Sequence, residues 1–144
     1  MSGNIDSNWA AVGIARSSGG NLLALLGRAM ISTIFLFSGV GKIGGASATI
    51  AYIASTGMPL PEVGLASAIA IEIGGGLALL LGYRTRLVAG GLSLFCLFTA
   101  ALFHNTFADQ NQLIHFLKNL AMAGGLLQIV AYGAGRYSLD ARRR

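Results

Sequence analysis

The sequence predicts an all-α integral membrane protein, folded as an antiparallel four-helix bundle. Of its 144 residues, 54% are hydrophobic and only 10% are charged, with a mean hydropathy of +0.68. Soluble domains carry roughly 25% charged residues, so a water-soluble chain of this size could not cover such a sequence with polar surface. In addition, four stretches approach the roughly 20 apolar residues that cross a bilayer as a helix. These stretches are residues 22–40, 63–81, 87–103 and 113–132.

The segments outside the expected spans complete the domain organisation. Residues 1–21 form a polar N-terminal tail that lacks the apolar centre of a cleaved signal, with Trp9 as an expected interfacial anchor. Residues 22–133 are the four-helix domain, and residues 134–144 are a basic tail. Glycines occur in every span, including 74–76, and small residues allow membrane helices to approach closely.

The connections predict how the spans are arranged. Residues 82–86 (GYRTR) and 104–112 (HNTFADQNQ) are short, so the spans that they join must pack antiparallel. The first connection is longer, and its ASATIAYIAS segment predicts a short interfacial helix at the outer mouth of the bundle. Gly57, Pro59 and Pro61 are expected to end that helix.

Charge asymmetry predicts the orientation in the inner (plasma) membrane. If the N-terminus is cytoplasmic, the outer side holds only Lys42 beside Glu62 and Asp109, and the arginines of the loops and tails lie inside. Those arginines are Arg16, Arg84, Arg86, Arg136, Arg142, Arg143 and Arg144. Both termini are therefore expected in the cytoplasm. The net charge of +5 is attributed to contact with anionic lipid headgroups, so no nucleic-acid partner is expected.

Charged residues within the spans are the candidate functional residues, because an ionised group in a bilayer is costly and turns toward a partner. Helical spacing places Arg28, Phe35 and Lys42 on one face of the first span. At a rise of about 1.5 Å per residue, Arg28 lies about 5 Å inside the midplane and Lys118 about 6 Å outside it. Glu72 lies between them, so a network of Arg28, Glu72 and Lys118 is expected. Lys42, His104 and His115 extend this polar path into a pocket that opens outward.

Redox and metal chemistry within the chain itself are constrained by composition. A single cysteine, Cys96, allows neither an internal disulfide nor a dithiol relay. Two histidines on different helices, without a second carboxylate nearby, are a poor metal-binding set. We therefore expect no metal and no cofactor of the chain's own.

Four segments resemble the DoxX family of small four-helix bacterial membrane proteins, over about residues 22–133. They are RAMISTIFLFSGVGKIGG, YIASTGMPLP, AIEIGGGLALLLGYRTRLVA and HFLKNLAMAGGLLQ. The matching positions are Arg28, Ser38, Gly39, Lys42, Gly57, Pro59, Glu72, Gly75, Gly82, Lys118, Asn119 and Gly125. Members of this family resemble or accompany a subunit of thiosulfate:quinone oxidoreductase, and others are linked to redox stress or aromatic catabolism. The resemblance thus implies quinone-linked redox work, with no single reaction shared by the family.

Three functions remain open from the sequence. In the first, Arg28, Glu72 and Lys118 form a structural network, and the protein is a scaffold or assembly partner without catalysis.

In the second, the pocket binds a quinone: Lys118 or His115 hydrogen-bonds a quinone oxygen and Glu72 exchanges a proton. The ring would contact Phe35 or Phe116, and Arg28, Lys42, His104 and Asn119 would complete the site. Electrons would then come from a soluble or membrane oxidoreductase subunit. In the third, the protein carries a small solute. Self-association into a homo-oligomer is compatible with each.

Overall fold

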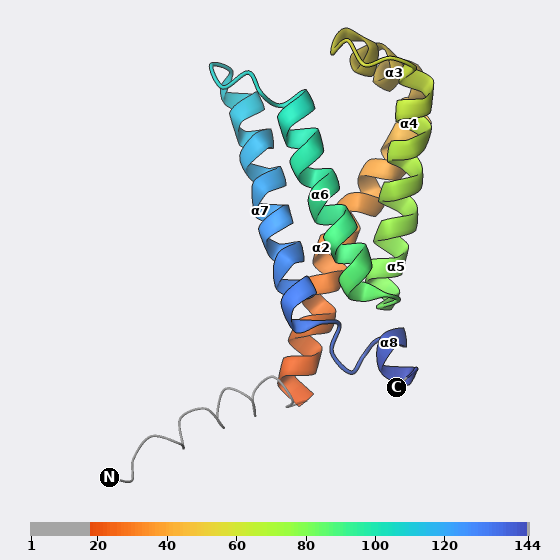
Figure 1. The fold of residues 1–144 in the computed structure, drawn as a ribbon, viewed down its shortest axis with the longest axis vertical. Coiled ribbons are helices and arrows are strands. Elements are labelled where there is room, and N and C mark those ends of the chain that lie inside the picture. The colour runs from red at the N-terminus through yellow and green to blue at the C-terminus, as the bar shows by residue number, and fades with distance from the viewer. Residues whose placement is uncertain (1–17, 144) are drawn as a thin grey trace, which may run out of the picture.

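The computed structural model describes residues 18–143, and this part of the chain is helical without strands. The elements in chain order are α2 (Ser18–Gly44), α3 (Ala46–Ser55), α4 (Pro61–Ile69), the π-helix η1 (Ala70–Gly74), α5 (Gly75–Leu81), α6 (Thr85–Phe103), α7 (Gln110–Tyr132) and α8 (Leu139–Arg142). The segments α4, η1 and α5 follow one another without a break, so they form one long helix (Figure 1).

The four predicted spans are confirmed by helices of sufficient length and hydropathy. Among the described residues, Ser18–Gly44, Pro61–Leu81, Thr85–Phe103 and Gln110–Tyr132 are each long and apolar enough to cross a membrane. The first helix extends beyond its predicted span at both ends, because hydropathy marks only the apolar part of a helix whose hydrogen bonding continues into polar flanks. It therefore begins within the predicted tail. The anchor proposed for Trp9 lies outside the described residues.

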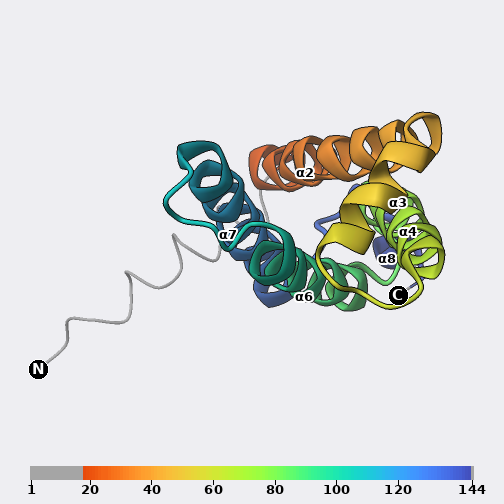
Figure 2. The same ribbon diagram turned by 90° about the horizontal axis from the view of Figure 1, so that it is seen from above.

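The helices are arranged as two antiparallel pairs. Helix α6 packs against α7 along its length, and α2 packs against the α4–η1–α5 helix (Figures 1 and 2). We call the end that holds the start of α2, the α5–α6 turn and the end of α7 the basal end, and the opposite end the distal end. Figure 1 shows the pairs meeting toward the basal end and diverging toward the distal end. The all-α antiparallel prediction is confirmed, with a bundle that is open distally.

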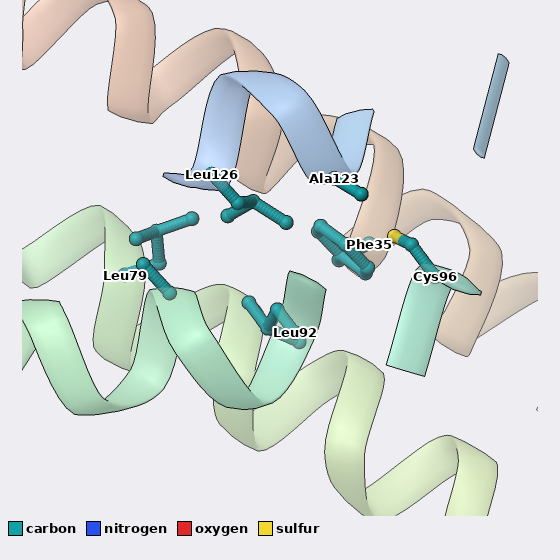
Figure 3. Packing of buried hydrophobic residues seen from close by; sticks show 7 residues of the cluster. Phe35, Leu79, Leu92, Cys96, Ala123 and Leu126 are labelled. Carbon is teal, nitrogen blue, oxygen red and sulfur yellow. The ribbon is translucent and has the colours of Figure 1, made fainter. Parts of the chain in front are cut away.

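The core lies where the two pairs meet. It consists of apolar side chains from all four spans, namely Phe35, Leu79, Ala89, Leu92, Cys96, Ala123 and Leu126 (Figure 3). Large apolar side chains elsewhere point outward, with Phe37 79% exposed and Met30 75% exposed. In a bilayer these residues face lipid tails, which are as apolar as the core itself.

The predicted interfacial helix is present as α3 at the distal end (Figure 2). Its Tyr52 hydroxyl donates a hydrogen bond to the carbonyl oxygen of Phe103 at 3.0 Å, and the two rings stack with centroids 5.6 Å apart. Helix α3 thus connects the α2–α4 side to the end of α6. After it, Gly57 adopts a φ of +79°, whereas Pro61 does not end α3 but begins α4, a position where proline's missing N–H is harmless.

Glycines allow the closest helix approaches. A Cβ added to Gly39 would lie 2.7 Å from Cγ1 of Ile73 and 3.2 Å from Cβ of Glu72, so α2 crosses η1 at this point. A Cβ on Gly75 would lie 2.8 Å from Cδ2 of Leu92 in α6. A Cβ on Gly76 would lie 3.0 Å from Cδ2 of Leu36 in α2. The packing role predicted for the glycines at 74–76 is therefore confirmed for Gly75 and Gly76, while Gly74 faces open space.

Candidate functional site

A partly buried ion pair joins α2 to the second span. The Lys42 Nζ atom donates to both carboxylate oxygens of Glu72, at 2.9 and 3.0 Å, and to the Ser38 hydroxyl at 2.7 Å. That hydroxyl donates in turn to Glu72 Oε1 at 3.2 Å. The Glu72 side chain is 7% exposed and that of Lys42 is 25% exposed. We call Ser38, Lys42 and Glu72 the ion-pair cluster.

The local structure explains why these three side chains meet. Ser38 and Lys42 are four residues apart on α2 and share one face of the helix. Gly39, between them, lets the backbone of η1 come close enough for Glu72 to reach both. Glu72 itself lies in a single π-helical turn, Ala70–Gly74. Such turns are rare and occur frequently at functional sites.

Arg28 does not pair with Glu72, so this part of the predicted network is wrong. Its Nη1 donates to the carbonyl oxygens of Leu79 (3.1 Å) and Leu80 (3.2 Å), and its Nη2 donates to that of Tyr137. The last carbonyls of a helix carry partial negative charge, which a guanidinium satisfies, and Leu79 accepts from Arg28 in addition to the Gly82 N–H. The prediction assumed upright helices with a common midplane. Because α2 crosses the second span at Gly39, residues 38–42 face Glu72 instead.

Most of the other candidates gather on the distal half of the α6–α7 pair. The rings of His104 and His115 stack with centroids 5.0 Å apart, and His104 Nδ1 lies 2.8 Å from Gln112 Oε1. Asn119 donates to the His115 carbonyl oxygen at 3.0 Å and accepts from Thr99 at 3.3 Å. Because these contacts stay within α6 and α7, the structure brings the polar residues of that pair together without joining them to the ion-pair cluster.

The remaining candidates differ in burial. Phe116 packs edge-on against Phe107, with ring centroids 5.0 Å apart. Phe35 is a core residue near Cys96, 4% exposed (Figure 3). Lys118 is exposed and makes no hydrogen bond or ion pair within residues 18–143, so the structure does not form its predicted contact with Glu72. The ligand-binding roles of these residues stay predictions.

A polar cluster at the basal end was not predicted. The Asp140 carboxylate accepts hydrogen bonds from the Arg84 N–H (2.8 Å), the Thr85 N–H (2.8 Å) and the Thr85 hydroxyl (2.7 Å). It thereby caps α6, which has no side-chain cap of its own. The Gly82 carbonyl oxygen accepts from the Asp140 N–H at 2.9 Å. We call Gly82, Thr85, Ser138 and Asp140 the C-terminal clasp. Ser138 before LDAR is an N-cap signal that could have indicated α8.

The clasp perturbs the titration of its carboxyl group. Burial acts to raise the pKa of Asp140, but hydrogen bonds from the Thr85 side chain and from the Thr85 and Arg84 backbone outweigh it. Together with the charge of Arg143, they hold the pKa of Asp140 below its ordinary value. The carboxylate form is therefore the one that stabilises the fold.

Two hollows lie toward the basal end. The larger has a volume of about 930 Å³ and lies between the start of α6 and the segment after α7. The smaller, about 270 Å³, lies between α2 and α7. Neither is lined by Glu72 or Lys118, so the outward-opening pocket inferred from the sequence stays a prediction.

Comparison with known proteins places this fold in a family. The DoxX family model matches residues 23–105, more than half of the chain. The chain belongs to the DoxX family. Inner membrane protein YqjF of Escherichia coli (strain K12) is 40% identical over 119 residues, covering 81% of this chain and 88% of its own length. Inner membrane protein YphA of the same strain is 32% identical over 126 residues, covering 84% and 90%. No solved structure matches the chain.

The DoxX match agrees with the four apolar helices, and this chain is accordingly a multi-pass inner-membrane protein. The residues matched by the family model include all three members of the ion-pair cluster as well as Arg28. They stop before α7, so the polar residues of that helix lie outside the match.

Proposed function

We propose that this DoxX-family protein is a membrane subunit of a quinone-linked redox system, in which the ion-pair cluster exchanges a proton with the quinone. The observation that carries the proposal is the Lys42–Glu72 pair, in which the buried Glu72 lies in a π-helical turn of a membrane span. Ionisable groups within a membrane are expensive to place and mark proton and ligand sites by default.

The chemistry assigns a role to each group. A quinone becomes a quinol by taking up two electrons and two protons. The electrons come from a partner oxidoreductase subunit, and the chain's own residues bind the quinone and handle protons. Lys42, the more exposed member of the pair, donates one proton to a quinone oxygen. Glu72, which thereby loses its counter-charge, takes up a proton from water. Lys118 or His115 hydrogen-bonds the second oxygen, donates the second proton to it and regains a proton from water, while Phe116 contacts the ring.

Ligand-induced stabilisation tests this proposal in purified protein. A short-chain quinone that binds only the folded state raises its stability by RT ln(1 + [L]/Kd), about 2.7 kcal/mol at one hundred times Kd. Lys118→Ala removes a side chain that has no partner among residues 18–143, so the variant keeps the parent's melting temperature but loses the shift. If saturating quinone stabilises neither protein, the ion-pair cluster is structural and a scaffold role replaces the proposal. If the variant is stabilised as much as the parent, Lys118 has no part in binding.

A solute carrier would be recognised by a different measurement on the same purified protein, namely transport. Reconstituted protein would move a small solute across vesicle membranes without any quinone. Transport that persists in the absence of quinone stabilisation would favour this alternative.

We also propose that both termini face the cytoplasm. The basal end holds Arg84, Arg86 and Arg136 and includes both the start of α2 and helix α8 (Figure 1). Reporter fusions at residue 143 and within 84–86 should read cytoplasmic, whereas a fusion within 106–110 should read external. Opposite readings at the two arginine-bearing sites would contradict the orientation.

A further inference from the structure

The larger basal hollow has the charge of an anion site. Its lining includes the arginines Arg84, Arg86 and Arg136 and one acid, Asp140. The acid is already engaged, since its two oxygens accept three hydrogen bonds from Arg84 and Thr85. No ion pair occupies the three guanidinium groups within the described residues. With three guanidinium groups against one carboxylate, the hollow carries a net positive charge.

Arginine favours one class of anion in particular. The guanidinium group is a planar fork of donors that matches the oxygens of a phosphate, often with two parallel hydrogen bonds. Two of these arginines lie at the start of α6 and the third follows α7, so they approach the hollow from different elements. The Arg86 guanidinium lies over Gly133, where an added Cβ would be 3.4 Å from its Nε.

The smaller hollow continues this site into the apolar part of the protein. It shares Tyr132 and Gly133 with the larger hollow and runs between α2 and α7, past Gly27 and Ile31. Gly27 has open space where a side chain would be. A groove of this kind accommodates hydrocarbon, whereas a free inorganic anion makes no use of it.

We propose that the two hollows together form a site for an anionic phospholipid. Arg84, Arg86 and Arg136 hold the headgroup phosphate, and one acyl chain lies in the groove between α2 and α7. Tyr132, 81% exposed, lines both hollows and lies where the two parts meet. Basic pockets at the ends of membrane helices recognise lipid headgroups in this way. This proposal rests on different residues from the quinone proposal and stands without it.

Delipidated protein in neutral detergent provides the test, by its melting temperature and by native mass spectrometry. Phosphatidylglycerol should raise the melting temperature and remain bound. Phosphatidylethanolamine and inorganic phosphate at the same concentration should do neither. The paired change Arg86→Gln with Arg136→Gln should weaken phosphatidylglycerol binding at least about tenfold, as expected for the loss of two charge-assisted contacts.

Two further variants separate the parts of the site. Arg142→Gln is the matched control: this exposed arginine lies outside both linings, and its loss should change the apparent affinity less than about twofold, as expected for a screened surface charge. Gly27→Leu fills the groove and should weaken lipid binding without lowering the lipid-free melting temperature. Each variant is compared with its own lipid-free state, so a change in fold stability does not obscure binding.

Each of four other results would contradict the phospholipid site, and each would point to a different explanation. Equal stabilisation by inorganic phosphate would indicate a site for soluble phosphate-bearing anions. Equal stabilisation by phosphatidylethanolamine would indicate ordinary surrounding lipid. If Arg142→Gln weakens binding as much as the paired change does, the attraction belongs to the basic surface as a whole. If Gly27→Leu binds as the parent does, the acyl chain is not in the groove.

Discussion

Arg28 and Glu72 are both buried charged residues in membrane spans, and their partners differ in kind. Arg28 donates to backbone carbonyls of α5 and of Tyr137, which neither gain nor lose protons. Glu72 is held by an amine and a hydroxyl, both of which carry exchangeable protons. Burial of a charge therefore does not identify a site by itself. The chemical nature of the partners distinguishes a structural anchor from a group that is available for proton exchange.

Replacing Arg28, the structural anchor, should have the largest effect on stability. Arg28→Leu leaves the last carbonyls of α5 and that of Tyr137 without their donor, and we expect a loss of about 3–5 kcal/mol in the free energy of unfolding. Denaturant unfolding in detergent measures it. Arg28→Lys keeps the charge but not the fork, so its loss should be smaller. A loss below about 1 kcal/mol for Arg28→Leu would mean that Arg28 is not a structural anchor, and the distinction between Arg28 and Glu72 would fail.

The ion pair should matter less for stability, because Lys42 reaches partly to the surface. We expect Glu72→Gln to lower the free energy of unfolding by about 1–3 kcal/mol by leaving the ammonium group without its counter-charge. Adding Lys42→Met should restore part of the loss. If the effects of the two changes simply add, the pair is not energetically coupled.

The crossing that creates the ion-pair cluster can be tested separately with two glycines of the same helix. Gly39→Ala places a methyl group against Ile73 and should destabilise the protein by about 1–2 kcal/mol through overpacking. Gly41→Ala meets nothing within 4 Å and should leave stability unchanged or slightly raised. Equal effects at both positions would mean that α2 and η1 do not approach closely at Gly39.

The smallest effect should come from the C-terminal clasp. Asp140→Asn weakens the cap of α6 and should cost about 0.5–2 kcal/mol. Because the folded-state pKa of Asp140 is lowered, its contribution is complete above the ordinary pKa of a carboxyl group and is lost as the pH falls through the lowered value. Thermal unfolding across acidic pH should therefore show a component in the parent that Asp140→Asn lacks.

The spans and α3 could be predicted because their signals are local. Hydropathy marks each span, and the short loops force antiparallel neighbours. Gly57 and the nearby prolines limit the ASATIAYIAS segment, which is α3 as predicted. The partner of Glu72 could not be predicted in the same way. It depends on where α2 crosses the second span and on a π-helical turn, both of which are set by tertiary packing.

The contacts at the basal end could not be predicted either, because they join residues that are far apart in the sequence. Asp140 caps a helix that begins 55 residues earlier in the chain, at Thr85. Ser138 could indicate the short helix α8, but no local pattern could indicate where α8 would dock. The basic hollow follows from that docking, so the sequence predicts from its arginines an orientation and a contact with anionic lipid headgroups, but not a site.

The claim that the ion-pair cluster is a site of proton exchange is tested most directly by infrared difference spectroscopy. The carboxyl region is compared between the oxidised and the reduced state of a bound quinone, in the parent and in Glu72→Gln. The account predicts a carboxyl protonation signal in the parent that is absent from the variant. If the parent gives no such signal, or if the signal persists in Glu72→Gln, then Glu72 is a structural anchor like Arg28.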